Sequence, residues 1–459
     1  MTDEPQPQPQ PVTWEAAPLL PDMFWDARPR LQHISNAARA NNAPRDAVLG
    51  ACLARVLWLT PHQIIPPTTI NKYGSLNAII CLLGASGTGK GNAINVATDL
   101  IADPHPADPL TGIAGNEVSY PHTQIGASSG EGLGAVYWER ELDELGHKAG
   151  WRRRNYGVLQ RVDEGEEAIK IGQRAGSTLW TQMRQAWSGQ QLGFENATDA
   201  HNRRQVAQGS YRYVMLVGFQ PATVGALLDD AAGGTPQRFT WFQSIDPGIG
   251  IGEAVEDPGP IDWRPPRWEN SPDNAYLTVL GQQRRPMTID PAAGAELLER
   301  ALAGIRGELG ALDGHSGNVQ LKLACALALL EGRLHVVDED WWLAEMVMAV
   351  SECVRGIAVE HQRAEQASAA ADRAHAQAVA HVTAVSAALD EEGARIQRVT
   401  DNVRRHLGRQ AMTKRELEKN CIYRPDRPYL DRVLRVMVAD GEVERVGTQL
   451  RLSTGESVT

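Results

Sequence analysis

The sequence contains no run of eighteen apolar residues, about the length that a helix needs to cross a membrane. The first fifteen residues, MTDEPQPQPQPVTWE, have neither a basic flank nor an apolar stretch, so they do not resemble a secretory signal. Only five cysteines occur, and no two form a CxxC pair. These absences predict a cytoplasmic protein with free thiols and no membrane contact, rather than a disulfide-bonded or zinc-binding one.

Excess positive charge is also missing, since the formal net charge is −11. This charge argues against a chain coated with nucleic acid. Residues 401–452 differ: twelve Lys and Arg against eight Asp and Glu give this segment a balance of +4. A small positive segment suits nucleic acid but does not establish it. The composition is otherwise ordinary, and 459 residues predict two or three domains.

Changes of pattern along the chain divide it into six segments. Residues 1–13 form a Pro/Gln tract that we expect to be disordered. Between 71 and 285, β-rich runs alternate with helical stretches, which predicts an α/β core with a parallel sheet and strands at 77–83, 156–162, 213–219 and 238–243. Helical spacing of apolar residues dominates the segments 14–70, 286–360 and 361–400, and helices followed by two short β-like runs occupy 401–455.

The run CLLGASGTGKGNAINVATDLI, residues 81–101, has the pattern of a strand, a glycine-rich turn and a helix. Its GASGTGK matches the G-x-x-x-x-G-K part of the P-loop pattern, in which small residues let backbone N–H groups converge on phosphate oxygens. The lysine and the helix N-terminus add positive charge. The alternative is a glycine-rich turn with a chance lysine. The predicted ATP site consists of Gly84, Ala85, Ser86, Gly87, Thr88, Gly89, Lys90, Gly91 and Asn92.

One part of the pattern is absent, because Gly91 stands where a Ser or Thr hydroxyl normally binds Mg²⁺. Three interpretations are open. A water molecule replaces the hydroxyl, a nearby side chain such as Ser86 or Thr88 substitutes for it, or hydrolysis is slow or lost. Nucleotide binding is compatible with all three.

Polar residues at the ends of two other predicted strands suit hydrolysis. In YGVLQRVDEGEE, Asp163 would orient Mg²⁺ through water and Glu164 would polarise the attacking water. A charged turn after an edge strand is the alternative. In YVMLVGFQP, Gln220 would sit between metal and water, although a buried structural glutamine fits the same pattern.

Arginines outside the turn suggest two further roles. Arg238, in GGTPQRFTWF, is a candidate arginine finger for a neighbouring subunit's site, or else forms an intramolecular salt bridge. Arg203 and Arg204 lie in a polar turn between two β-like runs, which predicts either a basic hairpin that contacts DNA phosphates or a solvated loop. The basic run WRRRN at 151–155 is predicted to be a solvated turn.

The last segment has the element order of a winged helix, three helices closed by a β-hairpin. Major-groove entry by the third helix is the familiar use of this shape, and docking to a protein is the alternative. The candidate DNA-binding side chains are Lys414, Arg415, Arg427, Arg432 and Arg435. Farther upstream, His315, Asn318 and Lys322 share one helix face, where they either reach a nucleotide or form the polar edge of a core helix.

The order of several motifs resembles the YfjI-like P-loop proteins of phages, prophages and integrated elements, which are similar to the helicase halves of primase–helicases. The resemblance covers roughly residues 25–360 and depends on GASGTGK, SSGEGL, VDE, STLWTQMRQAWSG, YRYVMLVGFQP, GTPQRF and LKLACALALLEGR. It implies a ring-forming ATPase in the replication of a mobile element. It also implies that Lys90, Asp163, Glu164, Gln220 and Arg238 have the roles given above, while Gly91 departs from the family pattern.

These patterns together predict an α/β P-loop NTPase core of the RecA/AAA+ type at 71–285, with a helical collar at 14–70. A helical lid at 286–360, a helical linker at 361–400 and a winged helix at 401–455 would follow. The expected function is an ATP- and Mg²⁺-dependent DNA motor or helicase loader, working as a homo-oligomeric ring, expected to be a hexamer, on single-stranded DNA. A separate primase would be a partner, since no primase domain precedes the core. Two alternatives are a slowly hydrolysing ATP switch and a winged-helix regulator of duplex DNA.

Overall fold

The computed structural model describes residues 17–104, 120–142, 144–193, 204–250, 254–267, 277–279, 281–310 and 314–453. The chain divides into two compact units, Met1–Ala364 and Glu365–Thr459. The helix α11 Asp338–Leu407 contributes residues to both units. None of the described helices combines the length and the apolar character that a membrane crossing requires.

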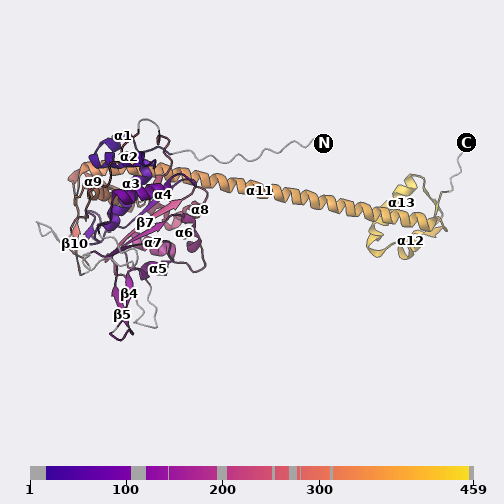
Figure 1. Ribbon diagram of the computed structural model, residues 1–459. Coiled ribbons are helices and arrows are strands. Elements are labelled where there is room, and N and C mark those ends of the chain that lie inside the picture. Colours follow the sequence, from indigo (N-terminus) through magenta and orange to yellow (C-terminus); the bar gives the residue numbers. More distant parts are fainter. Residues whose placement is uncertain are drawn as a thin grey trace. The chain divides into compact units, whose positions relative to one another are not determined.

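A five-stranded parallel sheet forms the centre of the first unit (Figure 1). Its order is β3 His122–Ile125, β6 Gly157–Val162, β7 Arg212–Phe219, β2 Ala78–Leu83 and β8 Phe239–Gln243. Strands β2, β7 and β8 are buried along their whole length, as the continuous apolar runs of parallel strands require. The predicted α/β class with a parallel sheet and all four predicted strands are confirmed.

The order of the strands in the sheet determines which strand ends lie next to one another. Strand β2 lies between β7 and β8 and does not pair with β3, the next strand of this sheet along the sequence. Because all five strands are parallel, the residues after β2, β6, β7 and β8 gather at one edge of the sheet. In open α/β sheets this carboxyl edge is where ligands bind.

Helices cover both faces of this sheet (Figure 1). On one face lie α3 Arg45–Leu59 and α4 Lys90–Leu100, and α5 Gly130–Ala135, α6 Gly165–Gly172 and α7 Leu179–Trp187 lie on the other. Helix α3 is buried almost completely, and a Cβ on its Gly50 would lie 2.6 Å from the Phe242 ring. This close approach makes α3 part of the core, preceded by α1 Asp22–Asp26 and α2 Pro29–Ala40.

Smaller elements complete the first unit. A β-sheet of β1 Ile64–Ile65, β10 Gln282–Pro286 and β9 Leu277–Val279 and the pair β11 Thr288–Ile289 with β12 His335–Val336 lie outside the central sheet. The helical pattern predicted from residue 290 onward is confirmed by α9 Pro291–Ile305, the buried α10 Ser316–Leu330 and α11. Short helical turns at α8 Gly225–Leu228, Asp229–Gly233 and Pro236–Arg238 lead into β8.

An antiparallel hairpin of β4 Trp138–Leu142 and β5 Lys148–Arg153 extends from the body of this unit (Figure 1). The prediction that the basic run at 151–155 is a solvated turn is wrong for residues 151–153, which belong to β5. In the register of the hairpin, Arg140 lies opposite Trp151 and Glu139 lies opposite Arg152.

The second unit has a hydrophobic core of its own, built on the end of α11. After α11 follow β13 Met412–Thr413, α12 Lys414–Asn420, the 3₁₀ turn Arg424–Tyr429, α13 Leu430–Ala439, β14 Val443–Val446 and β15 Gln449–Leu452. A capping box between Thr413 and Glu416 starts α12. The predicted order of helices and a final hairpin is confirmed, and β13 joins the hairpin as a third strand. Residues 363–391 of α11 are exposed.

Candidate functional site

The glycine-rich turn joins buried strand β2 to helix α4 at the carboxyl edge of the sheet. Gly87 and Gly89 have φ angles of +81° and +83°, which side chains rarely allow. Gly89 precedes the first residue of α4, an eleven-residue helix, so the turn faces the positive end of a helix dipole. The arrangement presents backbone N–H groups and partial positive charge in one place, which suits an anion such as phosphate.

The side chain of Lys90 curls back over this turn. Its ammonium nitrogen donates to the carbonyl oxygens of Gly84 at 2.7 Å and Ala85 at 2.8 Å. Burial lowers the pKa of Lys90, and the nearby Glu164 carboxylate opposes this shift. A Cβ on Gly218 of β7 would lie 2.5 Å from the Asp163 carbonyl oxygen, so this glycine lets the backbone after β6 approach β7. The Lys90 Cε lies in ordinary contact distance of the same position, 3.5 Å away. The positive charge is thus already placed over the turn.

The structure places the two acidic residues next to this region. Asp163 and Glu164 follow β6 directly, and both side chains are exposed. The Asp163 carboxylate accepts two hydrogen bonds from Arg161, at 2.7 Å and 3.0 Å. A metal ion at Asp163 would therefore compete with Arg161 for the carboxylate. Glu164 has no such contact among the described residues, and its charge acts on Lys90.

Gln220 is adjacent to the turn because the backbone N–H of Gly84 donates to the carbonyl of Phe219 at 3.0 Å. The side chain of Gln220 is partly buried, and its backbone carbonyl begins the turn toward α8. The sheet order, rather than sequence proximity, brings Lys90, Glu164 and Gln220 to one edge.

Gly91, the second residue of α4, has open space around it. No heavy atom lies within 4 Å of a Cβ built there. Of the two hydroxyls that the sequence offered as substitutes, Ser86 is exposed, and Thr88 bonds to the Ala85 carbonyl at 2.9 Å. The Thr88 hydroxyl also lies 2.6 Å from the hydroxyl of Ser244.

Ser244 is a residue of this region that the sequence did not reveal. It follows the end of β8, and its N–H donates to the Leu83 carbonyl at 2.8 Å. A polar residue after a buried strand was a visible signal, but its position beside Thr88 depends on β8 pairing with β2.

The segment that joins α2 to α3 contacts the first turn of α4. Asn92, predicted as a nucleotide ligand, donates from its side-chain amide to the Asn41 carbonyl at 2.8 Å. A Cβ on Gly89 would lie 3.1 Å from Pro44, the residue before α3. In the first turn of α3, Asp46 accepts a hydrogen bond from the Leu20 N–H at 3.1 Å. Burial raises the pKa of Asp46 to about 7.

Arg238 lies at the amino ends of the strands, opposite the carboxyl edge, because it immediately precedes β8. Lys90, by contrast, follows β2. Its guanidinium stacks on Trp187 at 5.5 Å and donates to the Gly234 carbonyl at 2.5 Å. Its Nε is buried without a hydrogen-bond partner among the described residues. Burial, followed by the neighbouring Arg184, lowers the pKa of Arg238. The predicted alternative of a salt bridge has no support in these contacts.

The residues on α10 have a structural role near this edge. Lys322 is buried and donates to the carbonyls of Asn77 at 2.6 Å and Trp187 at 2.8 Å. Its ammonium also lies 3.4 Å from the centre of the Trp187 ring. His315 packs edge-on against the same tryptophan. Both side chains lie near Arg238, and their contacts fit the polar edge of a core helix.

The polar turn predicted as a basic hairpin lies mostly outside the described residues, which end at 193 and resume at 204. Leu192 and Val206 exchange two backbone hydrogen bonds of 3.0 Å in an antiparallel bridge. Arg203 lies outside the described residues. The guanidinium of Arg204 stacks on Trp151 of β5 at 4.9 Å, and Arg140 of β4 stacks on the same ring at 4.0 Å. Arg204 and the β4–β5 hairpin therefore meet in a surface where an aromatic ring is combined with guanidinium groups.

In the second unit, most of the predicted DNA-binding side chains already have a partner within the chain. Lys414 forms an ion pair with Asp431 at 2.5 Å, and Arg432 pairs with Glu392 at 2.8 Å. Arg435 donates to the backbone of its own helix, and Arg427 to the carbonyls of Ile422 and Lys419. The contacts of Lys414 and Arg432 reduce the charge that they offer to another molecule.

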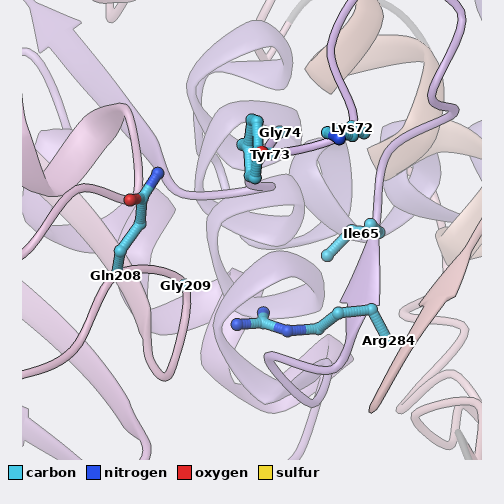
Figure 2. Close-up of a pocket in the computed structure, with 7 residues that line it drawn as sticks. All are labelled: Ile65, Lys72, Tyr73, Gly74, Gln208, Gly209 and Arg284. Carbon is cyan, nitrogen blue, oxygen red and sulfur yellow. The ribbon is translucent and has the colours of Figure 1, made fainter. Parts of the chain in front are cut away.

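A small pocket lies away from the turn, on β1 and β10 (Figure 2). Figure 2 shows Arg284 extending from β10 toward Gly209. Its guanidinium donates to Gln282 at 2.6 Å and to the His62 carbonyl at 3.3 Å, and burial lowers its pKa to about 10. The arginine thus cross-links chain segments. The pocket is lined by Ile65, Lys72, Tyr73, Gly74, Gln208, Gly209 and Arg284.

Comparisons with known proteins add no family to this description. No protein-family model matches the chain, and no curated protein matches it. The resemblance noted in the sequence stays a prediction, and the geometry of the residues carries the functional argument.

Proposed function

We propose that this protein is a P-loop ATPase that acts on DNA as a ring oligomer, as a helicase-like motor or helicase loader in phage or prophage replication. One observation carries the proposal. Lys90 and the N-terminus of α4 converge on a glycine-rich turn that follows a buried central strand. This is the arrangement that binds nucleoside triphosphates through backbone N–H groups and a lysine.

The chain's own groups suggest how ATP would be held. The backbone N–H groups of the turn would bind the phosphate oxygens, and Lys90 would exchange the Gly84 and Ala85 carbonyls for the β- and γ-phosphates. Glu164 would orient the attacking water, with Gln220 beside it. Asp163 would hold Mg²⁺ through water once Arg161 releases it. Magnesium would neutralise the charge that develops on the phosphates.

The position of Arg238 supports an oligomer. The five residues of β8 separate it from the carboxyl edge, a distance of about 17 Å at about 3.3 Å per residue. Arg238 therefore has no route to the nucleotide of its own subunit. A neighbour in a ring, expected to be a hexamer, would receive it as an arginine finger.

Two surfaces support DNA binding. Arg204, Trp151 and Arg140 combine guanidinium groups with an aromatic ring, as in sites for single-stranded nucleic acid. In the second unit, the order of elements from α11 to β15 is that of a winged helix, with exposed Arg415 and Arg435 for duplex DNA. A separate primase is a partner that this function would need.

Calorimetry with a non-hydrolysable ATP analogue and Mg²⁺ tests the nucleotide site, and Lys90→Ala should abolish the binding. Lys170→Ala, an exposed lysine paired with Glu166, is a matched control that should bind normally. Mass photometry with analogue and single-stranded DNA should show a ring. Absence of binding by the wild-type protein would refute the proposal, and a monomer under every condition would refute the ring motor.

A second candidate is a slowly hydrolysing ATP switch that recruits partners on DNA. Two observations favour it: no hydroxyl follows Lys90, and Asp163 is engaged by Arg161. Steady-state phosphate release separates the two candidates. Single-stranded DNA should stimulate a motor several-fold and leave a switch unchanged.

A further inference from the structure

Ser244 joins the end of β8 to the glycine-rich turn. Its hydroxyl lies 2.6 Å from the Thr88 hydroxyl and donates to it, because Thr88 uses its own proton for the Ala85 carbonyl. The Leu83 carbonyl lies 3.3 Å from the Ser244 oxygen. Ser244 is only 2% exposed, although the turn that it contacts is largely open to solvent. A buried strand end is thus bonded to the middle of an exposed turn.

The hydroxyls of Ser244 and Thr88 both lie against Gly84. A Cβ on Gly84 would collide with the Ser244 hydroxyl oxygen and would lie 2.6 Å from that of Thr88. The Thr88 hydroxyl also reaches the Ala85 carbonyl at 2.9 Å, and Lys90 reaches the same carbonyl at 2.8 Å. The Thr88 hydroxyl therefore links Ser244 to the backbone carbonyl that precedes Ser86, and Lys90 holds the same carbonyl independently.

We propose that Ser244 is a positioning residue of the nucleotide site, which acts through Thr88 to hold the turn in the conformation that receives phosphates. The inference rests on the proposed nucleotide binding. Glycines at 87 and 89 give the free turn many conformations, and a turn that is already ordered loses less entropy when the ligand binds. Because Ser244 is only 2% exposed and its hydroxyl is bonded to Thr88, positioning suits it better than metal binding.

The test compares two buried serines that contact the same strand. In Ser244→Ala the bond to Thr88 is lost, and the Kd and KM for ATP should rise about fivefold, as for one hydrogen bond, with kcat nearly unchanged. In the control Ser351→Ala, the lost hydroxyl accepts from the N–H of Trp241 at 2.8 Å, three residues before Ser244 and without a bond to the turn. This control should lower the melting temperature and leave Kd unchanged.

Variants of Thr88 test the contact from its exposed side. Thr88→Val should weaken binding as Ser244→Ala does, Thr88→Ser should restore it, and the double variant should be no weaker than either single one. Equal Kd values for Ser244→Ala and Ser351→Ala would overturn the inference, as would additive effects in the double variant. Both results differ from failure of the proposed function, in which the wild-type protein itself binds no nucleotide.

Discussion

The ammonium nitrogen of Lys90 lies 2.7 Å from the carbonyl oxygen of Gly84, so the lysine is bonded to the turn that it would serve. If its role is to bind phosphate, Lys90→Ala should abolish ATP binding with little change in melting temperature, because the freed Ala85 carbonyl lies in the exposed part of the turn, where water can hydrate it. Calorimetry and thermal melting would measure both. A large loss of stability with unchanged binding would identify a structural lysine instead.

Gly91→Ser tests the missing hydroxyl. The new side chain has space, since no heavy atom lies within 4 Å of its Cβ. It would provide the magnesium ligand that the turn lacks, and we expect Mg²⁺-dependent phosphate release to rise about tenfold or more. Gly91→Ala is the control, because it adds a Cβ and helix propensity without a hydroxyl. Equal rates for the two variants would show that the hydroxyl does not limit turnover.

Mixing two inactive variants tests whether Arg238 acts on a neighbour. Arg238→Ala should still bind ATP and hydrolyse it at least a hundredfold more slowly. Lys90→Ala should not bind it. If Arg238 serves the next subunit, mixed rings contain some sites with both residues intact, and mixing should restore part of the activity. Rates that only average after mixing would place both residues in one subunit or leave Arg238 a structural role on Trp187.

Adjacent residues of β5 offer a sharp test of the hairpin surface. Trp151 contacts Arg140 and Arg204, whereas Arg152 points to the other face and pairs with Glu139 at 2.5 Å. Trp151→Ala should weaken binding of labelled oligo-dT about tenfold in fluorescence anisotropy, and Arg204→Ala should also reduce its salt dependence. Arg152→Ala should have little effect. Equal losses at 151 and 152 would argue against a specific face.

Asp46 should make stability depend on pH. Its pKa of about 7 in the folded protein exceeds the ordinary value of 3.8, so the folded state holds the proton more tightly than the unfolded chain. Stability should therefore fall as the pH rises from about 4 to about 7 and level off above that. Asp46→Asn should remove this part of the decline in thermal melts between pH 5 and pH 8.

Asp22→Asn is the matched control for this experiment. Asp22 forms an ion pair with Arg45, the residue before Asp46, and is largely exposed, so Asp22→Asn removes a nearby carboxylate while the buried Asp46 stays in place. Its pH profile should remain that of the wild type. An unchanged profile in Asp46→Asn would show that another group titrates.

The sequence predicted those parts of the fold that depend on local pattern. The continuous apolar runs of β2 and β7 predicted buried parallel strands, whereas β3, with its polar HTQI at the edge, was missed. The residues WRRR were assigned to a turn because their basic side chains hid the alternation of a hairpin strand. Pairing with Trp138–Leu142 made it a strand, and this pairing cannot be read from local composition.

Candidate site residues were predictable where they lie beside one another in sequence, as in GASGTGK. Ser244 was not, because its position beside Thr88 depends on the strand order that brings β8 next to β2. The ion pair between Arg161 and Asp163 was also missed: the strand at 156–162 was predicted, but Asp163 directly after it was assigned to the metal and not to a partner two residues before it. Sequence patterns predict the elements, and sheet order decides which of their ends meet.

Strand β8 has Arg238 directly before its first residue and Ser244 directly after its last. An extended, fully enclosed strand neither stretches nor shortens appreciably, so a shift at one end reaches the other. In a closed ring each β8 would then couple two nucleotide sites rigidly: the site of its own subunit, beside Ser244, and the neighbouring subunit's site, which Arg238 would enter. The order in which subunits hydrolyse ATP would then be set by the direction in which β8 runs between the two sites, without a separate signalling element.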